Sequence, residues 1–231
     1  MKKVSWTGVF VVLFFGAASA QDCSQSFYAM KEGTKYTLSH FNEKGKLQSS
    51  SESVLKSVKA NGNVYEANIE ATMKKENGKP MGEPRNFVVK CENGIVKMDI
   101  NSMFMTDMGA PMKGMEMTIS GTGISIPATL SEGQTLDSGS TEIKVGSGGM
   151  TFMTMKFDIT NRKVEKKESL TVAAGTFDCY KISYDMDMKV LVKKNLHVVQ
   201  WMSPGVGMVK SQNFNSKGEL EGYSELTKFE K

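Results

Sequence analysis

The strongest constraint on the fold of this sequence is a period of two in hydrophobicity, which runs through several long segments. In residues 65–74, apolar and polar residues alternate strictly, and the same alternation returns in 153–160 and 179–190. Successive side chains of a β-strand point to opposite faces, so each segment predicts a strand with one buried and one solvated face. Half-buried strands of this kind are typical of antiparallel sheets.

Turn signals separate the predicted strands. Six dipeptides end in glycine at such places: Lys44-Gly45, Asn61-Gly62, Asn77-Gly78, Asn93-Gly94, Ala174-Gly175 and Lys217-Gly218. Asparagine and glycine tolerate the positive φ of tight turns, so neighbouring strands are expected to pair as hairpins. We interpret the glycine-rich stretch 138–149 as a flexible loop, and only 99–112 has helical character. The predicted fold class is therefore all-β, a curved antiparallel sheet or open β-barrel of about ten strands with at most one or two short helices.

One sequence pattern, F-N-x-K-G-x-L, occurs twice, in residues 41–47 and again in 214–220. It predicts two hairpins with the same turn. If these hairpins lie near one another where the sheet curls, they help to protect its edges, which favours a barrel-like shape.

The N-terminus has the three parts of a secretory signal peptide. Lys2 and Lys3 precede an apolar run at 9–15, and small residues follow up to Ala20. We expect cleavage between Ala20 and Gln21, so that 1–20 is a signal peptide and 21–231 a single β-rich envelope domain. The apolar run is shorter than the ~20 residues of a membrane-spanning helix.

Three cysteines follow the leader, namely Cys23, Cys91 and Cys179. An exported protein permits a disulfide, and the sequence leaves open which two of the three pair. Asp22 directly before Cys23 does not resemble a lipoprotein processing site. The cysteines lack C-x-x-C spacing, so no metal site is predicted from them.

Charge excludes one class of partner. The formal net charge is +4, and removing Lys2 and Lys3 with the leader leaves +2. Charges of both signs are interspersed along the chain, so we expect no nucleic-acid partner and see no reason for an anionic membrane partner.

Methionine is the most unusual component, with 18 residues in the chain. Thioethers suit Cu(I), but most M-x-M pairs continue an apolar strand face, so core filling explains them first. The second interpretation is an adaptable apolar cavity or lid. The candidate residues for an apolar ligand or lid are Met103, Met105, Met108, Met112, Met115, Met117 and Trp201. For Trp201, packing in the core is the favoured role.

Catalytic patterns are missing from the sequence. His40 and His197 stand in no Ser-His-Asp, Cys-His or H-E-x-x-H context, and the short glycine runs lack the setting of a phosphate loop. We therefore expect no enzyme activity and no cofactor.

Two longer motifs carry a family resemblance. Residues 173–182 (AAGTFDCYKI) and 201–210 (WMSPGVGMVK), with Ile126-Pro127 and Asn161-Arg162-Lys163-Val164, resemble the TapB-like family of secreted proteins from Bacteroidetes-type bacteria. The resemblance covers nearly all of 21–231 and implies a curved sheet or open barrel in the periplasm or at the cell surface of a Gram-negative-type bacterium. It implies no chemistry.

The function predicted from these features is the binding of an apolar ligand such as a lipid, a lipid-modified partner or another envelope protein. Two alternatives stay open: an assembly component of the envelope without a small ligand, and a methionine-rich Cu(I)-binding protein.

Overall fold

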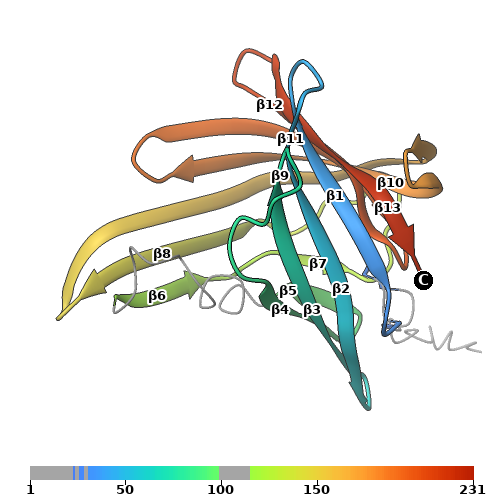
Figure 1. Ribbon diagram of the computed structural model, residues 1–231, viewed down its shortest axis with the longest axis horizontal. Coiled ribbons are helices and arrows are strands. Elements are labelled where there is room, and N and C mark those ends of the chain that lie inside the picture. The colour runs from blue at the N-terminus through green and yellow to red at the C-terminus, as the bar shows by residue number, and fades with distance from the viewer. Residues whose placement is uncertain (1–22, 24–25, 29–30, 99–114) are drawn as a thin grey trace, which may run out of the picture.

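The computed structural model describes Cys23 and residues 26–28, 31–98 and 115–231, which form one antiparallel sheet of thirteen strands (Figure 1). The strands are β1 Lys35–Asn42, β2 Leu47–Asn61, β3 Val64–Lys75, β4 Arg85–Glu92, β5 Ile95–Met98, β6 Glu116–Gly121, β7 Ser125–Pro127, β8 Gly139–Ser147, β9 Met150–Val172, β10 Gly175–Lys189, β11 Lys193–Ser203, β12 Gly207–Phe214 and β13 Leu220–Glu230. The predicted all-β class is confirmed.

The strand order is β6-β8-β9-β10-β11-β12-β13-β1-β2-β3-β4-β5-β7, so β6 and β7 are the two edges and the sheet is open. Most neighbours are hairpins, and all six predicted turns connect paired strands. The strand count exceeds the predicted ten partly because β5 and β7 have only four and three residues, too short to show a period.

The loop predicted for 138–149 is wrong, because β8 occupies most of it. Thr141, Ile143 and Val145 are buried on one face of β8 and pair with β9. The alternation of these three residues is the strand signal, and the surrounding glycines obscured it. Gly146 is not a sign of a flexible loop. Position 146 requires glycine because a Cβ there would lie 2.1 Å from the carbonyl oxygen of Met150.

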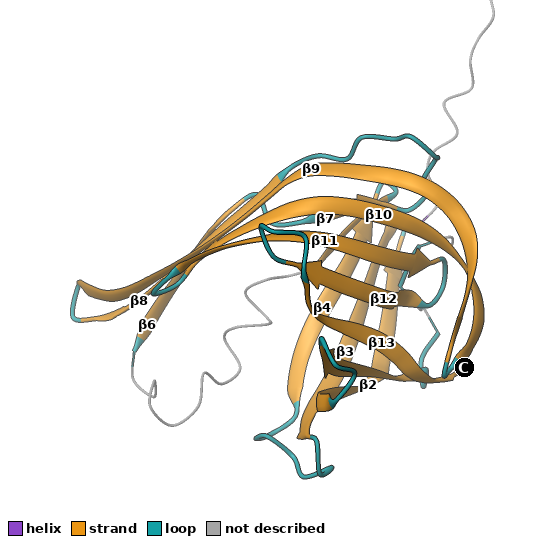
Figure 2. Ribbon diagram, turned by 90° about the horizontal axis from the view of Figure 1, so that it is seen from above, coloured by secondary structure: helices purple, strands orange, loops and turns teal. Residues whose placement is uncertain are grey.

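Strong curvature brings distant parts of the sheet together (Figure 2). β9 and β10 arc over β11–β13, and the amide of Ala174 in their hairpin turn donates to the Leu226 carbonyl of β13 at 3.3 Å. Beside this contact, the Phe177 and Phe229 rings pack edge to face with 6.0 Å between centroids. The curl therefore closes one end of the molecule although the sheet has free edges.

The repeated F-N-x-K-G-x-L pattern forms the same turn twice, as predicted. The Asn42 side-chain oxygen accepts hydrogen bonds from the amides of Lys44 and Lys46, and the Asn215 oxygen accepts the two equivalent bonds. The two turns are neighbours because β1 pairs with β13, where Phe41 stacks on Tyr223 at 4.9 Å.

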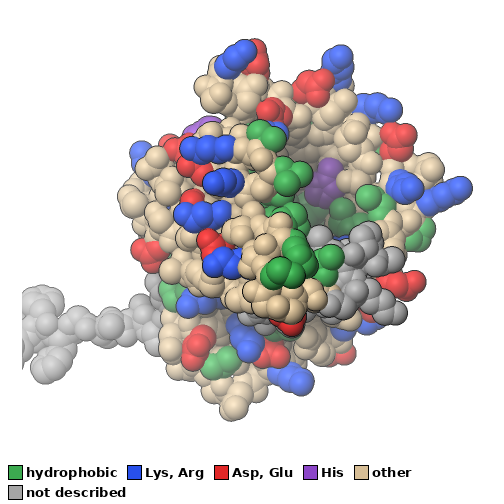
Figure 3. Space-filling model, turned by 90° about the vertical axis from the view of Figure 1, so that its left-hand side faces the viewer, with side chains coloured by type: hydrophobic (Ala, Val, Ile, Leu, Met, Phe, Trp, Pro, Cys, Tyr) green, Lys and Arg blue, Asp and Glu red, His purple; other side chains and the backbone are tan. Residues whose placement is uncertain are grey.

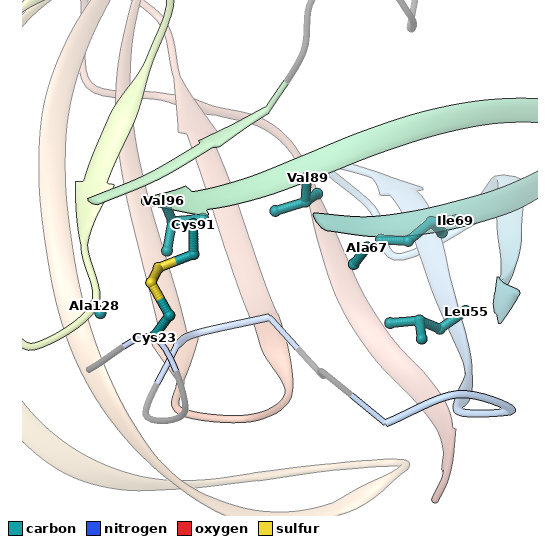
Figure 4. Close-up of a cluster of buried hydrophobic side chains, with 8 residues drawn as sticks. All are labelled: Cys23, Leu55, Ala67, Ile69, Val89, Cys91, Val96 and Ala128. Atoms are coloured by element: carbon teal, nitrogen blue, oxygen red, sulfur yellow. A yellow bond between two sulfur atoms is a disulfide. The ribbon is translucent and has the colours of Figure 1, made fainter. Parts of the chain in front are cut away.

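A disulfide joins Cys23 to Cys91 and lies in a core cluster that also contains Leu55, Ile69 and Val96 (Figure 4). The bond ties the segment before β1 to β4. Cys179 is a free, buried thiol. The pairing that the sequence left open is thus Cys23 with Cys91.

Several expectations lie outside the described residues: the signal peptide with its cleavage site at Ala20 and Gln21, and the helical character of 99–112. They stay predictions, as does the division into a leader and one mature domain. Among the described residues, no helix is long and apolar enough to cross a membrane.

Candidate functional site

An inner cavity of about 180 Å³ lies among β5, β7, β9, β10 and β11. Its wall is mainly apolar, with a few polar groups that converge on it. The lining residues are Tyr28, Val96, Met98, Ile124, Ser125, Ile126, Ile159, Arg162, Tyr184, Gln200 and Met202. An apolar hollow with a small number of polar groups is the usual form of a small-molecule site.

Arg162 reaches this cavity through a β-bulge in β9. The pairing of β9 with β10 shifts here, so that Asn161 and Arg162 together lie opposite Tyr184. Asn161 has φ of 53°, a conformation that asparagine adopts more readily than most residues. Bulges of this kind redirect side chains, and this one places a long cationic side chain on the buried face.

The Arg162 side chain is only 6% exposed and is held by two backbone carbonyls. One guanidinium nitrogen donates to Ser125 at 2.8 Å and to Asp137 at 2.7 Å. Burial lowers the pKa of Arg162 from its usual value, while Tyr184 and Asp137 act in the opposite direction. Because arginine keeps its proton at any ordinary pH, the cavity contains a fixed positive charge.

Two tyrosines complete the polar part of the wall. Burial raises the pKa of Tyr28 to about 12, with smaller effects from Tyr36 and Tyr184. Burial also raises the pKa of Tyr184 to about 12, and the nearby Arg162 opposes this shift. Both phenols are therefore neutral hydroxyls at physiological pH, able to donate a hydrogen bond to an anion.

A surface groove of about 500 Å³ lies next to this cavity and shares one residue with it, Met98. Ile95 and Ile119 give the groove apolar contacts, and Lys90 and Lys97 lie on its wall. Met98 is thus the common boundary of the two hollows. Its unbranched side chain has more freedom to move than a branched aliphatic residue would.

A second groove, of about 820 Å³, runs over β9–β12 and contains a polar cluster. His197 Nδ1 lies 2.9 Å from a carboxylate oxygen of Asp185, whose second oxygen accepts a hydrogen bond from Asn161 at 2.7 Å. Asn195 donates to Asp187 in the same groove. These groups are largely exposed and satisfy each other, and no group of three metal-ligating side chains occurs among the described residues.

The predicted methionine site is only partly described. Met103, Met105, Met108 and Met112 lie outside the described residues, so their role stays a prediction. Met115 is 42% exposed, whereas Met117 packs against the cluster of Ile143, Val145 and Met155. The structure brings none of the described candidates to the inner cavity.

Trp201 is 8% exposed and lies on β11 between Lys181 of β10 and Lys210 of β12. Its indole N–H donates to Glu168 at 2.9 Å, and the Lys181 ammonium lies 5.6 Å from the ring centroid. It packs with Cys179, Val206 and Val209. Its environment is that of a packed core residue with a satisfied polar atom.

Sequence reasoning missed Arg162 as a functional residue. A signal was available, since Arg162 is one of only two arginines in a chain rich in lysine, and it lies within a strand pattern. The residues that surround it come from five strands and from the segment before β1, which no local pattern relates to one another.

Comparison with known proteins agrees with this architecture. The chain is similar to a Bacteroides fragilis protein named as exported with a YmcC-like fold (20% identity, TM-score 0.71, 90% of this chain and all of that one). It is equally similar to a Parabacteroides distasonis protein named as a lipoprotein (22% identity, TM-score 0.71, 91% of this chain and all of that one). Both names are consistent with export of this chain to the envelope. No curated protein matches the chain significantly.

A family model described as DUF3108-like matches residues 31–226, which include all thirteen strands except the last part of β13. The match spans most of the sequence beyond the predicted leader. The chain therefore belongs to the DUF3108-like family.

Proposed function

We propose that this protein binds an apolar ligand with an acidic head group, of the fatty-acid type, in the inner cavity. The observation that carries the proposal is the buried Arg162 in an otherwise apolar hollow. A buried cation is costly unless it is compensated, and the two carbonyls that Arg162 contacts are neutral. The exposed Asp137 carboxylate offsets this cost only in part, and a ligand carboxylate would supply a negative charge inside the cavity.

The geometry supports this head-group chemistry. The guanidinium has five N–H donors, and one of its nitrogens carries both of the contacts to Ser125 and Asp137. The remaining donors, together with the Tyr28 and Tyr184 hydroxyls, are of the type that binds a carboxylate in two-point contact. Ile159 and Met202 offer apolar contacts to the first carbons of a chain.

The volumes of the cavity and of the neighbouring groove indicate where the alkyl chain of the ligand would lie. Pockets for drug-sized ligands take about 300–1,000 Å³, so a cavity of about 180 Å³ holds only a head group and the carbons next to it. The groove of about 500 Å³ beyond Met98 has room for the rest. A change in the Met98 rotamer would connect the two. The sequence predicts an apolar lid in the methionine-rich segment that follows Met98.

The setting of this function is the cell envelope, as the N-terminal sequence predicts and as the names of the two structural neighbours suggest. We place the chain in the narrower TapB-like group of secreted proteins on the motifs at 173–182 and 201–210. No catalytic role is included in the proposal.

Calorimetric titration of the delipidated mature protein with sodium decanoate tests the proposal. We expect saturable binding with one site, and 1-decanol, which has the same chain without the charge, should bind at least tenfold more weakly. Arg162→Lys keeps the charge but removes the planar fork, so it should weaken decanoate binding about tenfold. Arg85→Lys, at the exposed second arginine, is the matched control and should change nothing.

A second variant keeps the proposal testable if Arg162→Lys does not fold. Tyr184→Phe removes one hydroxyl from the cavity wall and changes the cavity volume by only one oxygen atom. We expect a several-fold loss of decanoate affinity with an unchanged circular dichroism spectrum. Equal affinity for decanoate and decanol, or no saturable binding to the folded protein, would reject the proposal. The second result would favour the assembly role that the sequence left open.

A further inference from the structure

The hairpin turn between β10 and β11 carries three consecutive apolar side chains that project into solvent. Val190 is 40% exposed, Leu191 89% and Val192 79%. The local sequence is Lys189-Val190-Leu191-Val192-Lys193-Lys194, so lysines flank the apolar tip on both sides. Turns normally carry polar residues, and contiguous exposed apolar side chains mark a contact surface.

A second apolar tip lies at the same end of the sheet. Lys189 pairs with Lys156 in the register of β10 and β9, and β9 extends from Lys156 back to its start at Met150, about 20 Å further out. There Met150 is 66% and Phe152 59% exposed. Figure 1 shows both hairpin ends on the left-hand side, and Figure 3, which faces that side, shows apolar side chains next to lysines.

Lysines form a row at the base of the β10–β11 tip. Lys156, Lys189 and Lys193 lie directly opposite one another on β9, β10 and β11. Like charges in directly opposite positions destabilise a sheet, so this arrangement has an energetic cost for the folded protein. Lys156 is compensated by Asp158 at 3.0 Å. Lys189 and Lys193 form no ion pair with any residue in the described part of the chain.

We propose that this end of the sheet docks on an anionic phospholipid surface. Leu191 and Val192 would enter the boundary between head groups and acyl chains, and Lys189 and Lys193 would contact lipid phosphates directly above it. The apolar residues at the tip match the acyl-chain boundary of such a surface, and the basic residues next to them match its phosphate head groups, as in other interfacial anchors. The net charge of the chain conceals this feature, because acidic residues balance it, among them Asp158 and Asp187, two residues further from the tip.

The proposal is independent of the cavity around Arg162. None of Val190, Leu191 and Val192 lines that cavity, so a change at the tip leaves the ligand site intact. Each tip variant should also be titrated with decanoate. A variant that loses vesicle binding but keeps decanoate binding tests the docking proposal without affecting the proposed ligand site.

Co-sedimentation of the mature protein with vesicles tests the docking. We expect binding to an equimolar mixture of phosphatidylglycerol and phosphatidylcholine at low salt, and weak binding to phosphatidylcholine alone. The double change Leu191→Ser with Val192→Ser should reduce the partition coefficient at least about tenfold, because two apolar side chains no longer leave water. Lys189→Gln with Lys193→Gln should reduce binding and flatten its dependence on salt.

Met81→Ser is the matched control, since Met81 is 51% exposed but lies in the turn between β3 and β4. This variant should bind as the wild type does. Leu191→Trp should show a blue-shifted fluorescence maximum on the mixed vesicles. The proposal is overturned if the serine double variant partitions like the wild type, or if the wild type does not bind mixed vesicles. A dimer that the serine changes dissociate, without vesicle binding, would instead identify a contact between copies.

Discussion

Asn161 and Arg162, adjacent on β9, face opposite sides of the sheet: the Asn161 amide donates to Asp185 at 2.7 Å on the exposed side, and the Arg162 guanidinium donates to Ser125 and Asp137 carbonyls inside. The bulge that they form thus connects the exposed polar groove with the inner cavity. Its backbone is further fixed by the segment after β7, where the Leu136 amide donates to the Arg162 carbonyl at 2.9 Å.

The left-handed φ of Asn161 gives a first prediction. Asn161→Val places a β-branched residue in that conformation and should lower the free energy of unfolding by about 1–2 kcal/mol or more. Asn161→Gly loses only the hydrogen bond to Asp185 and should cost about 1 kcal/mol or less. Urea denaturation measures both. Equal effects of valine and glycine would mean that the bulge conformation places no demand on the side chain.

The repeated turn allows a graded comparison. Asn42 and Asn215 each accept two backbone hydrogen bonds, whereas Asn77 accepts one, from Lys79. We expect Asn42→Ala and Asn215→Ala to destabilise the protein by similar amounts, about 1–2 kcal/mol, and Asn77→Ala by about half as much. Chemical denaturation gives the three values, and a larger effect at Asn77 would contradict the interpretation of the turns.

The Cys23–Cys91 disulfide closes a loop across a sequence separation of 68 residues. Replacing both cysteines with serine should lower stability by about 2–4 kcal/mol, mainly because the unfolded chain regains freedom. The intact protein should have a mass two hydrogens below the reduced mass and should lose thermal stability on addition of a reductant. An unchanged melting temperature under reducing conditions would show that the bond has no stabilising role.

The buried tyrosines predict instability at alkaline pH. The pKa values of Tyr28 and Tyr184 are raised to about 12 in the folded protein from 10.0 in the unfolded chain. The folded state therefore holds more protons between these values, so the contribution to stability is complete below pH 10 and is lost as the pH rises through 12. Ultraviolet titration should show that Tyr28 and Tyr184 still hold their protons well above pH 10.

Tyr28→Phe and Tyr184→Phe provide the control for that titration. Each should remove one late-ionising group and reduce the loss of stability above pH 10. Ionisation of Tyr28 and Tyr184 near pH 10 in a protein that is still folded would contradict the buried environment of these two phenols.

Much of the fold is predictable because its signals are local. The alternation in 65–74, 153–160 and 179–190 predicts β3, β9 and β10, and the glycine turns predict the hairpins that join these strands to their neighbours. The repeated F-N-x-K-G-x-L pattern predicts two turns of the same form, and the strands β1 and β13 beside them are paired. Each of these inferences needs only residues close in sequence, or one repeated pattern.

The candidate site is not predictable in the same way. Tyr28, Arg162 and Gln200 become neighbours only through the curvature of the sheet, and period two cannot tell which face of a curved strand surrounds a cavity. The bulge at Arg162 interrupts the alternation and reverses the expected direction of its side chain. The pairing of the cysteines is not predictable from the sequence for a related reason, because the curvature of the sheet determines which two sulfur atoms come together.

Native mass spectrometry of the mature protein, purified gently from its own host, tests the central claim most directly. The account predicts an added mass equal to a fatty-acid-type ligand on the wild-type protein and on Arg85→Lys, and a clearly smaller ligand-bound fraction of folded Arg162→Lys. A wild-type mass that equals the sequence mass, less only the two hydrogens of the Cys23–Cys91 disulfide, would contradict it. An equal ligand-bound fraction of Arg162→Lys would also contradict it, because the ligand would then bind equally well without the buried guanidinium.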